Sequence, residues 1–197
     1  MSEERRNMEI EEEVKARLSA RRYGHTMRVA HTAQELARRY GVNEHDAYTA
    51  GLLHDVTREL SREEQLKLCE KHGIILDNVS KETPALIHAI TGAFVAKHEF
   101  HASDEICSAV RYHTVGRAEM TRLERVIWLS DMIEPAREFR GVDKLRTLAN
   151  EDLDCAVLEG LNLTFMHLIP KMQRVHVSML EARNWLLSLV GDKMKGM

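Results

Sequence analysis

The sequence has few of the residues that cross-link a protein or carry it through a membrane. Its three cysteines, Cys69, Cys107 and Cys155, are isolated, and no Cys-x-x-Cys pair occurs. We therefore expect no disulfide framework and a reducing, cytoplasmic setting. The longest stretch without a charged residue, residues 83–96, is too short to span a bilayer. The N-terminal residues are highly charged and contain no apolar signal core, so secretion is not indicated.

The sequence also lacks a large excess of positive or of negative charge. Lys and Arg number 28 against 31 Asp and Glu, which gives a net charge of −3. Binding to nucleic acid or to an anionic membrane through overall charge is therefore not expected. The 197 residues, 44% of them hydrophobic, suffice for one domain with a real core. Aromatic residues make up only 5%, whereas histidine, the commonest metal ligand, occurs 11 times.

Proline and glycine are scarce, and most of them fall where helices should begin or end. Apolar residues recur at helical spacing from Thr26 to Tyr40, after which Gly41 ends the pattern. Capping boxes at Ser61–Glu64 and Thr121–Glu124 mark two further helix starts. No strand alternation and no hairpin signal accompany these patterns.

These patterns predict an all-α protein, a single bundle of eight or nine helices. The expected helices cover residues 8–21, 26–40, 43–57 and 61–73, begin at 84, 103 and 121, and cover 152–169 and 178–190. Residues 1–22 are expected to form an N-terminal helix, 23–190 the main domain and 191–197 a C-terminal tail.

Several histidines and two acids fall on apolar helix faces that should point inward. These residues are His25, the pair His54-Asp55, His88, His113 and Asp131. A buried carboxylate is costly unless it is paired, hydrogen-bonded or bound to a metal. The cluster could therefore share a cation, because imidazole suits Fe, Cu, Ni or Zn and carboxylate admits Mn. The alternative is that each histidine is an ordinary hydrogen-bonded core residue. Six others are expected on the surface or in the ordinary core, with no role: His31, His45, His72, His98, His101 and His167.

The ordered set H…HD…H…H…D resembles the HD-domain metal-dependent phosphohydrolases. The short motifs around these residues are similar to those of the YqeK-type branch. Its members are bacterial enzymes that cut diadenosine tetraphosphate symmetrically into two ADP. The resemblance extends from about Tyr23 to Asn184 and implies a single HD-domain helical bundle. It is carried by residues 50–55 (AGLLHD), 86–93 (LIHAITGA), 111–116 (RYHTVG), 129–137 (LSDMIEPAR) and 181–184 (EARN).

The resemblance implies roles for the ordered residues. His25, His54, Asp55 and Asp131 match the metal ligands, and the metal is typically iron, with Mn, Co, Ni or Zn as alternatives. One or two metal ions are both compatible with the pattern. The residues expected to act in catalysis are Asp55, His88, His113 and Arg137. The substrate would touch these four together with His25, Arg58, Thr114, Asp131, Lys171, Arg174 and His176.

Two positions depart from the family pattern. Many HD proteins have Lys three residues after the Asp, where this chain has Arg58. Arg keeps the charge but is a planar fork rather than a point charge, which puts a phosphate-binding role for this position in doubt. His176 is followed by Val177 where Pro is expected, which puts the geometry of that loop in doubt.

The sequence is also compatible with two other functions. The chain could be an HD phosphohydrolase for a deoxynucleotide, a cyclic nucleotide or an alarmone. It could also be a non-catalytic module that senses a nucleotide, although all six candidate positions are intact. A nucleotide partner is expected in each case, and the sequence leaves a homodimer open.

Overall fold

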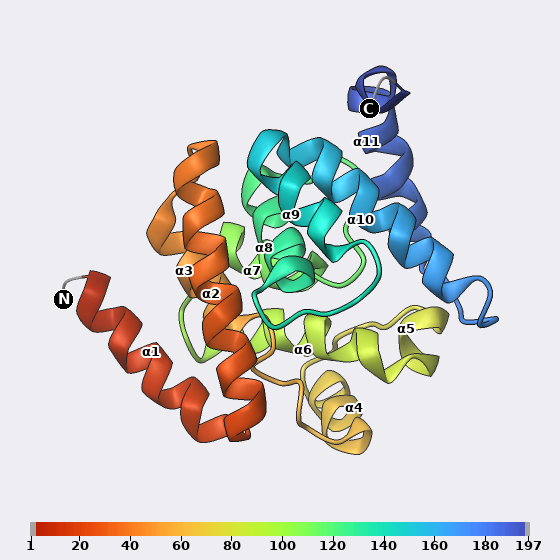
Figure 1. The fold of residues 1–197 in the computed structure, drawn as a ribbon. Coiled ribbons are helices and arrows are strands. Elements are labelled where there is room, and N and C mark those ends of the chain that lie inside the picture. The colour runs from red at the N-terminus through yellow and green to blue at the C-terminus, as the bar shows by residue number, and fades with distance from the viewer. Residues whose placement is uncertain (1–2, 196–197) are drawn as a thin grey trace.

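The computed structural model describes residues 3–195, and these residues form eleven α-helices and no strand (Figure 1). The all-α prediction is therefore confirmed, with more helices than the eight or nine expected. The helices are α1 (Glu3–Arg17), α2 (Ala20–Tyr40), α3 (Glu44–Leu53), α4 (Arg62–Lys71), α5 (Asn78–Glu82), α6 (Pro84–His98), α7 (Asp104–Tyr112), α8 (Arg122–Ile133), α9 (Val142–Glu151), α10 (Leu153–Leu168) and α11 (Val177–Lys195).

Local sequence signals set many of the helix ends. The capping boxes of Ser61 with Glu64 and of Thr121 with Glu124 are both formed, as predicted. Gly41 ends α2 with a φ of 66°, in the left-handed region that glycine adopts without strain. The Asn43 side chain accepts hydrogen bonds from the first amides of α3.

Several predicted boundaries are wrong. The helix expected over residues 8–21 is broken, because Ser19 starts a new helix by accepting a hydrogen bond from the Arg22 amide at 3.3 Å. Helix α3 ends at Leu53 rather than near Thr57, and turns follow it. Helices α5 and α9 were not predicted. Helix α5 is very short, and α9 follows the N-cap residue Gly141, whose φ is 100°.

The C-terminal helix is longer than expected. Helix α11 continues to Lys195, well into the segment predicted as a tail, and residues 196 and 197 of that segment lie outside the described ones. Residues 1 and 2 of the expected N-terminal helix also lie outside them. Within the described part, α1 buries Ile10 and Val14 in the same core cluster as the main bundle.

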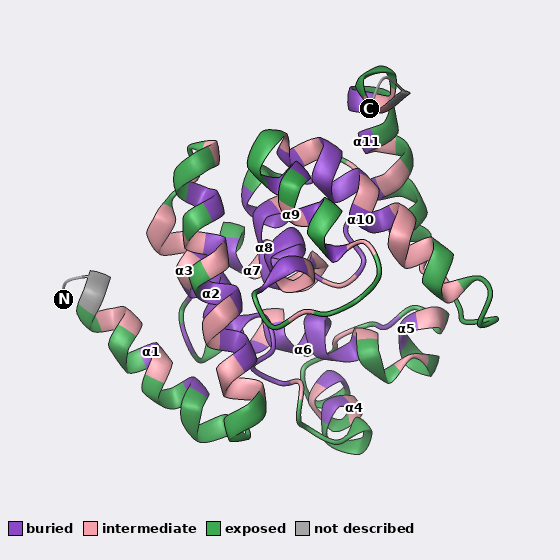
Figure 2. Cartoon of the chain, in the orientation of Figure 1, coloured by how far each residue is buried: buried purple, intermediate pink, exposed green. Residues whose placement is uncertain are grey.

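The core lies where α2, α3, α8 and α10 meet, in the centre of Figure 2. Small residues let these helices approach closely. A Cβ atom on Gly51 of α3 would lie 2.6 Å from the Ala30 Cα atom of α2, and one on Gly160 would lie 2.7 Å from the Trp128 ring. Glycine at these positions therefore fixes how α3 lies on α2 and α10 lies on α8.

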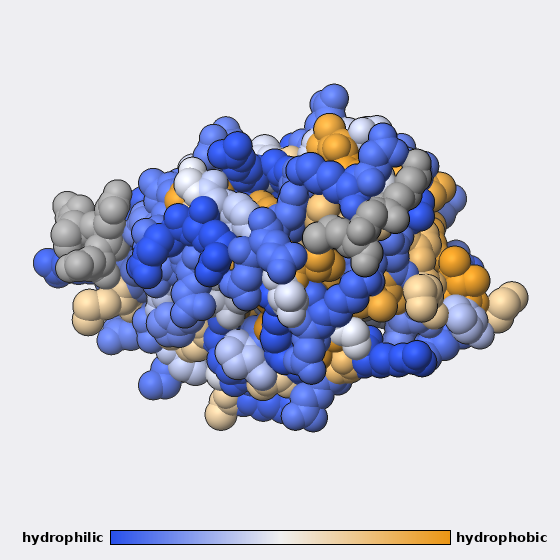
Figure 3. Space-filling view, turned by 45° about the horizontal axis from the view of Figure 1, so that its top comes forward, coloured by the Kyte–Doolittle hydropathy of each residue, from blue (hydrophilic) through white to orange (hydrophobic). Residues whose placement is uncertain are grey.

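The face shown in Figure 3 is mostly hydrophilic, with hydrophobic side chains gathered on its right. Exposed large hydrophobic residues concentrate in α10, α11 and the loop between them: Met166, Ile169, Met172, Val177, Leu180, Leu187 and Leu189. Among the described residues, no helix combines the length and the apolar character that crossing a bilayer requires.

Candidate metal centre and pocket

Helix ends from five elements converge on one buried cluster. His25 lies in the second turn of α2, and His54 and Asp55 directly follow α3. His88 lies in the second turn of α6, His113 follows α7, and Asp131 lies in the last turn of α8. The helix middles form the apolar core, so the polar cluster forms where the helices end and the core opens towards solvent.

The structure brings together all six residues that the sequence singled out. The His25 Nε2 atom lies 3.0 Å from Asp131 Oδ1 and 3.8 Å from Asp55 Oδ2. Asp55 Oδ2 is 3.4 Å from His54 Nε2, and Asp55 Oδ1 is 3.1 Å from His88 Nε2. His113 Nε2 lies 3.1 Å from His88 Nε2 and 4.0 Å from Asp55 Oδ1. Asp55 is thus the common neighbour of all four imidazoles.

The outward ring nitrogens of three histidines face oxygen atoms. His54 Nδ1 donates to the Gly51 carbonyl at 2.6 Å, and His113 Nδ1 donates to the Val110 carbonyl at 2.7 Å. His25 Nδ1 lies 3.2 Å from a carboxylate oxygen of Glu134. Carbonyl and ionised carboxylate oxygens only accept, so these partners assign the proton to Nδ1 and leave the Nε2 lone pair pointing inward.

Electrostatics at the cluster favour a positive charge at its centre. The pKa of Asp55 is held well below its usual range by His54 and His88, although burial acts to raise it. Asp131 has a lowered pKa as well, because His25, His54 and Arg137 outweigh its burial. Burial opposes charging of His54, yet Asp55 and Asp131 raise its pKa. Burial, with His88 and His54 nearby, lowers the pKa of His113 to about 3, so this imidazole is neutral.

The donor set fits a divalent metal. The buried Nε2 atoms of His25 and His54 have no partner with hydrogen-bond geometry, a costly arrangement that a cation would relieve. Three overlapping groups each place their ligand atoms within 4.8 Å of one another: His25, His54 and Asp55; His54, His113 and Asp131; and Asp55, His88 and His113. Neutral imidazoles and ionised carboxylates are the forms that bind metals.

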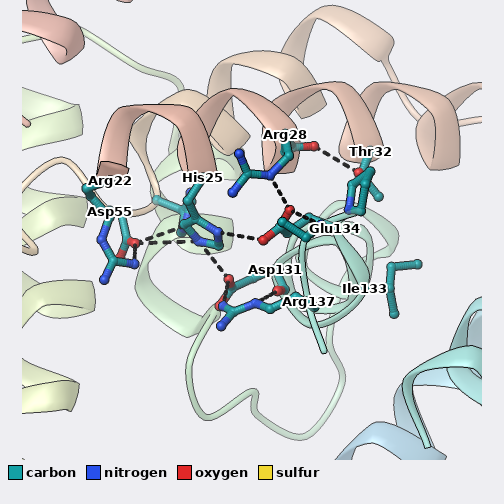
Figure 4. Close-up of polar contacts among 12 residues, drawn as sticks. Arg22, His25, Arg28, Thr32, Asp55, Asp131, Ile133, Glu134 and Arg137 are labelled. Carbon is teal, nitrogen blue, oxygen red and sulfur yellow. Dashed lines mark hydrogen bonds and ion pairs between the residues drawn. The ribbon is translucent and has the colours of Figure 1, made fainter. Parts of the chain in front are cut away.

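Glu134 supports the cluster from outside and was not assigned a role from the sequence. Figure 4 shows His25 between Asp55 on one side and Glu134 on the other. The Glu134 carboxylate accepts from Arg28 Nε at 2.5 Å and from the Ala136 amide at 2.9 Å, and is 2% exposed. The signal that could have revealed it is an acidic residue directly after the apolar run that contains Asp131.

Arginines surround the two carboxylates. Arg22 donates to Asp55 Oδ2 at 2.9 Å (Figure 4). Arg137 contacts the Asp131 side chain, and its Nε atom donates to the Asp131 backbone carbonyl at 2.7 Å. Arg22, His25 and Arg28 recur every third residue on one face of α2, a spacing that is visible in the sequence. The Arg146 guanidinium donates to the carbonyls of residues 133, 134 and 137 and so holds the loop that carries Arg137.

A pocket of about 720 Å³ opens above the cluster. Its floor includes Asp55, His88, His113 and Asp131, and its walls include the predicted substrate contacts Arg58, Thr114, Arg137, Arg174 and His176. Apolar side chains complete the walls, namely Leu86, Val115, Trp128, Met132, Leu168 and Met179. A few cations above a charged floor and an apolar wall suit a nucleotide-sized anion.

Two predicted contacts lie away from this pocket. The Lys171 ammonium is exposed, where it lies 3.0 Å from His167 Nε2, and it does not line the pocket. His25 lies beneath the floor rather than on it. The histidines expected to have no role are exposed or half-buried and lie outside the cluster: His31, His45, His72, His98, His101 and His167.

Comparisons with known proteins agree with this geometry. A family model described as HD domain matches residues 22–136. A Bacillus subtilis (strain 168) protein named "Bis(5'-nucleosyl)-tetraphosphatase, symmetrical" is 39% identical, with 89% of this chain and 94% of the relative covered. A relative of the same name from Halalkalibacterium halodurans is 36% identical, with 88% and 93% covered.

A solved structure is also similar. It is described as a predicted HD superfamily hydrolase involved in NAD metabolism from Clostridium acetobutylicum. The TM-score is 0.88 at 35% sequence identity, and the match covers 91% of this chain and 96% of that one. The likeness therefore spans both the cluster and the C-terminal helices that complete the pocket.

Proposed function

The chain belongs to the HD-domain family, and from this premise we propose that it hydrolyses diadenosine tetraphosphate symmetrically to two molecules of ADP. The observation that carries the proposal is the buried His and Asp cluster at the floor of an arginine-lined pocket of about 720 Å³. Relatives that match nearly the whole chain are named for this activity, which supports the same substrate class.

His25, His54, Asp55 and Asp131 are the residues that would hold a divalent metal. Iron is our first candidate because the family that the chain resembles typically holds iron. Manganese, cobalt, nickel or zinc are alternatives, since the set combines imidazole with carboxylate and contains no thiolate. Such a cation supplies Lewis-acid polarisation of a phosphoryl oxygen and lowers the pKa of water.

The chain's own side chains would bind the phosphates and move the proton of the attacking water. Arg58, Arg137 and Arg174 line the pocket and would neutralise the phosphate oxygens, with the Thr114 hydroxyl as a further donor. The Asp55 and Asp131 carboxylates both line the pocket, so either could orient the attacking water or take its proton. His88 and His113 lie beside Asp55, within reach of the oxygens on which charge develops.

Symmetric cleavage requires that the tetraphosphate lie in one register. The apolar walls above the floor would take one nucleoside, which places the second and third phosphates over the cluster. Arg174 and His176 at the pocket rim would then meet the outer phosphates. A nucleotide, rather than nucleic acid or a membrane, remains the expected partner, and the three free cysteines support a reducing, cytoplasmic setting.

Product identification tests this function. Purified protein is incubated with diadenosine tetraphosphate and each candidate metal in turn, and nucleotides are separated by ion-exchange chromatography. We expect two ADP per substrate and no activity after chelation. ATP plus AMP would overturn symmetric cleavage. A faster turnover of deoxynucleotides, cyclic nucleotides or alarmones in the same assay would favour the alternative HD hydrolase.

A further inference from the structure

His88 is held differently from the other three imidazoles of the cluster. Its Nδ1 atom lies 3.1 Å from a terminal nitrogen of Arg58, whereas His25, His54 and His113 turn Nδ1 towards an oxygen. A guanidinium has only donors and keeps its proton in proteins. His88 Nδ1 therefore accepts the hydrogen bond, and the neutral ring carries its proton on Nε2.

The inward partners of His88 agree with this assignment. Its Nε2 atom lies 3.1 Å from Asp55 Oδ1 and 3.1 Å from His113 Nε2. The carboxylate oxygen of Asp55 offers lone pairs, and His113 Nε2 is an acceptor because its Nδ1 donates to the Val110 carbonyl. Both neighbours thus present acceptor atoms to the single Nε2–H of His88, and neither donates a hydrogen bond to it.

The fold places Arg58 for this contact. The turn after α3 brings the Arg58 amide to the Asp55 carbonyl at 2.8 Å, one turn past the His-Asp pair. The Thr57 hydroxyl donates to the His88 carbonyl at 2.9 Å and so fastens this turn to α6. The Thr57 hydrogen bond therefore keeps Arg58 and His88 close to each other, in addition to the contact between their own side chains.

We propose that Arg58 is a positioning residue that keeps His88 as an Nε2–H donor, and that His88 donates this hydrogen to a phosphate oxygen rather than binding metal. An imidazole nitrogen that carries a proton has no free lone pair and cannot be a ligand. The inference deepens the proposed function and rests on it for the identity of the phosphate. It removes His88 from any second metal site, and it gives Arg58 a role in addition to neutralising phosphate charge.

The first measurement is independent of turnover. Protein with ¹⁵N-labelled histidine and bound diamagnetic zinc is examined by NMR, with the His88 signals identified by their loss in His88→Gln. We expect a protonated Nε2 and an unprotonated Nδ1 for His88 in the wild type. Arg58→Met should lose this pattern and Arg58→Lys should retain it. Arg174→Met, which removes another pocket arginine, should leave it unchanged.

The second measurement combines metal content with kinetics. We expect the same zinc content per chain in the wild type, Arg58→Met and His88→Gln. With diadenosine tetraphosphate, kcat should fall by about 10- to 100-fold in His88→Gln, the loss of one hydrogen bond to a charged group. Arg58→Met should fall by about tenfold, and Arg58→Lys should recover most of that loss.

Two results would overturn the inference. One is an unprotonated, zinc-bound Nε2 of His88 in the wild type; the other is a second zinc per chain that is lost in His88→Gln. Circular dichroism identifies any variant that does not fold, and Arg58→Gln then replaces Arg58→Met. If diadenosine tetraphosphate is not cleaved at all, the proposed function fails, while the NMR pattern and the zinc content still decide the role of Arg58.

Discussion

The floor and the mouth of the pocket are built in opposite ways. At the floor, each buried imidazole is oriented by a second polar group, as His25 is by Glu134. The mouth is the pocket rim formed by α5 and the loop of residues 169–176. There the two segments face each other through the pairs Arg174–Glu82 and His176–Asp77. The Arg174 and Glu82 side chains are 55% and 54% exposed, whereas the Asp55 side chain is 5% exposed.

This difference suits two roles: the floor holds the groups that act on the reacting phosphate, and the mouth admits the substrate. Groups that must meet a reacting phosphorus within a fraction of an ångström gain from rigid support. Exposed ion pairs contribute little and exchange readily with other charges, so the mouth can open for a large, flexible dinucleotide. Changes at the floor should therefore have much larger effects than changes at the mouth.

The largest effect is expected from Asp55→Ala, because this carboxylate is the common neighbour of all four imidazoles. Loss of the metal removes several kcal/mol of transition-state stabilisation, so turnover should fall by about 10³-fold or more. Metal at about 100 times its Kd should stabilise the wild type by about 2.7 kcal/mol against unfolding and leave the variant unaffected. Calorimetry with and without metal measures this second effect.

The chain contains a matched control for that variant. A second His-Asp pair, His45-Asp46, begins α3 at a partly exposed site far from the cluster. Asp46→Ala should retain turnover and metal stabilisation. Equal metal binding by Asp55→Ala and the wild type would show that the cluster is not the metal centre.

The next largest effect is expected from Glu134→Gln. The amide keeps the size of the side chain but removes the charge that holds His25 Nδ1–H and the Arg28 guanidinium. Loss of a group that orients a metal ligand costs about 10- to 100-fold in metal affinity. Competition with a chromophoric chelator measures the affinity. Glu138→Gln, on an exposed part of the same loop, is the control, and equal affinities in both variants would remove Glu134 from the support of the floor.

A smaller effect is expected from Gly51→Ala, which changes the support of the floor without touching it. The new Cβ atom would lie 2.6 Å from the Ala30 Cα atom, so α2 and α3, which position His25 and His54, must separate. Overpacking of this kind costs about 1–3 kcal/mol in the free energy of unfolding, measured by urea titration. Gly24→Ala in α2 meets only the end of the Arg28 side chain, at 3.4 Å, and should not destabilise. Equal stability of both variants would contradict the close approach.

The sequence predicted the floor better than the mouth. The floor depends on residues whose burial is costly without a partner, and such residues stand out in apolar helices, as Asp131 does. Glu134 was missed because its role appears only when α2 lies against the end of α8. Short elements such as α5 carry little periodicity, and the pairing of Glu82 with Arg174 across distant segments has no local signal.

The smallest effect is expected at the mouth, from the pair Arg174–Glu82. Arg174→Ala removes a cation that would meet the outer phosphates, so KM for diadenosine tetraphosphate should rise by about two- to fivefold, with metal affinity unchanged. Glu82→Ala frees the same guanidinium from its partner, so KM should stay equal or fall. Both differences should shrink at high salt, because exposed charges are screened. Initial rates at two salt concentrations measure them. A large loss of kcat in either variant would mean that the mouth takes part in the chemistry, and the division between floor and mouth would fail.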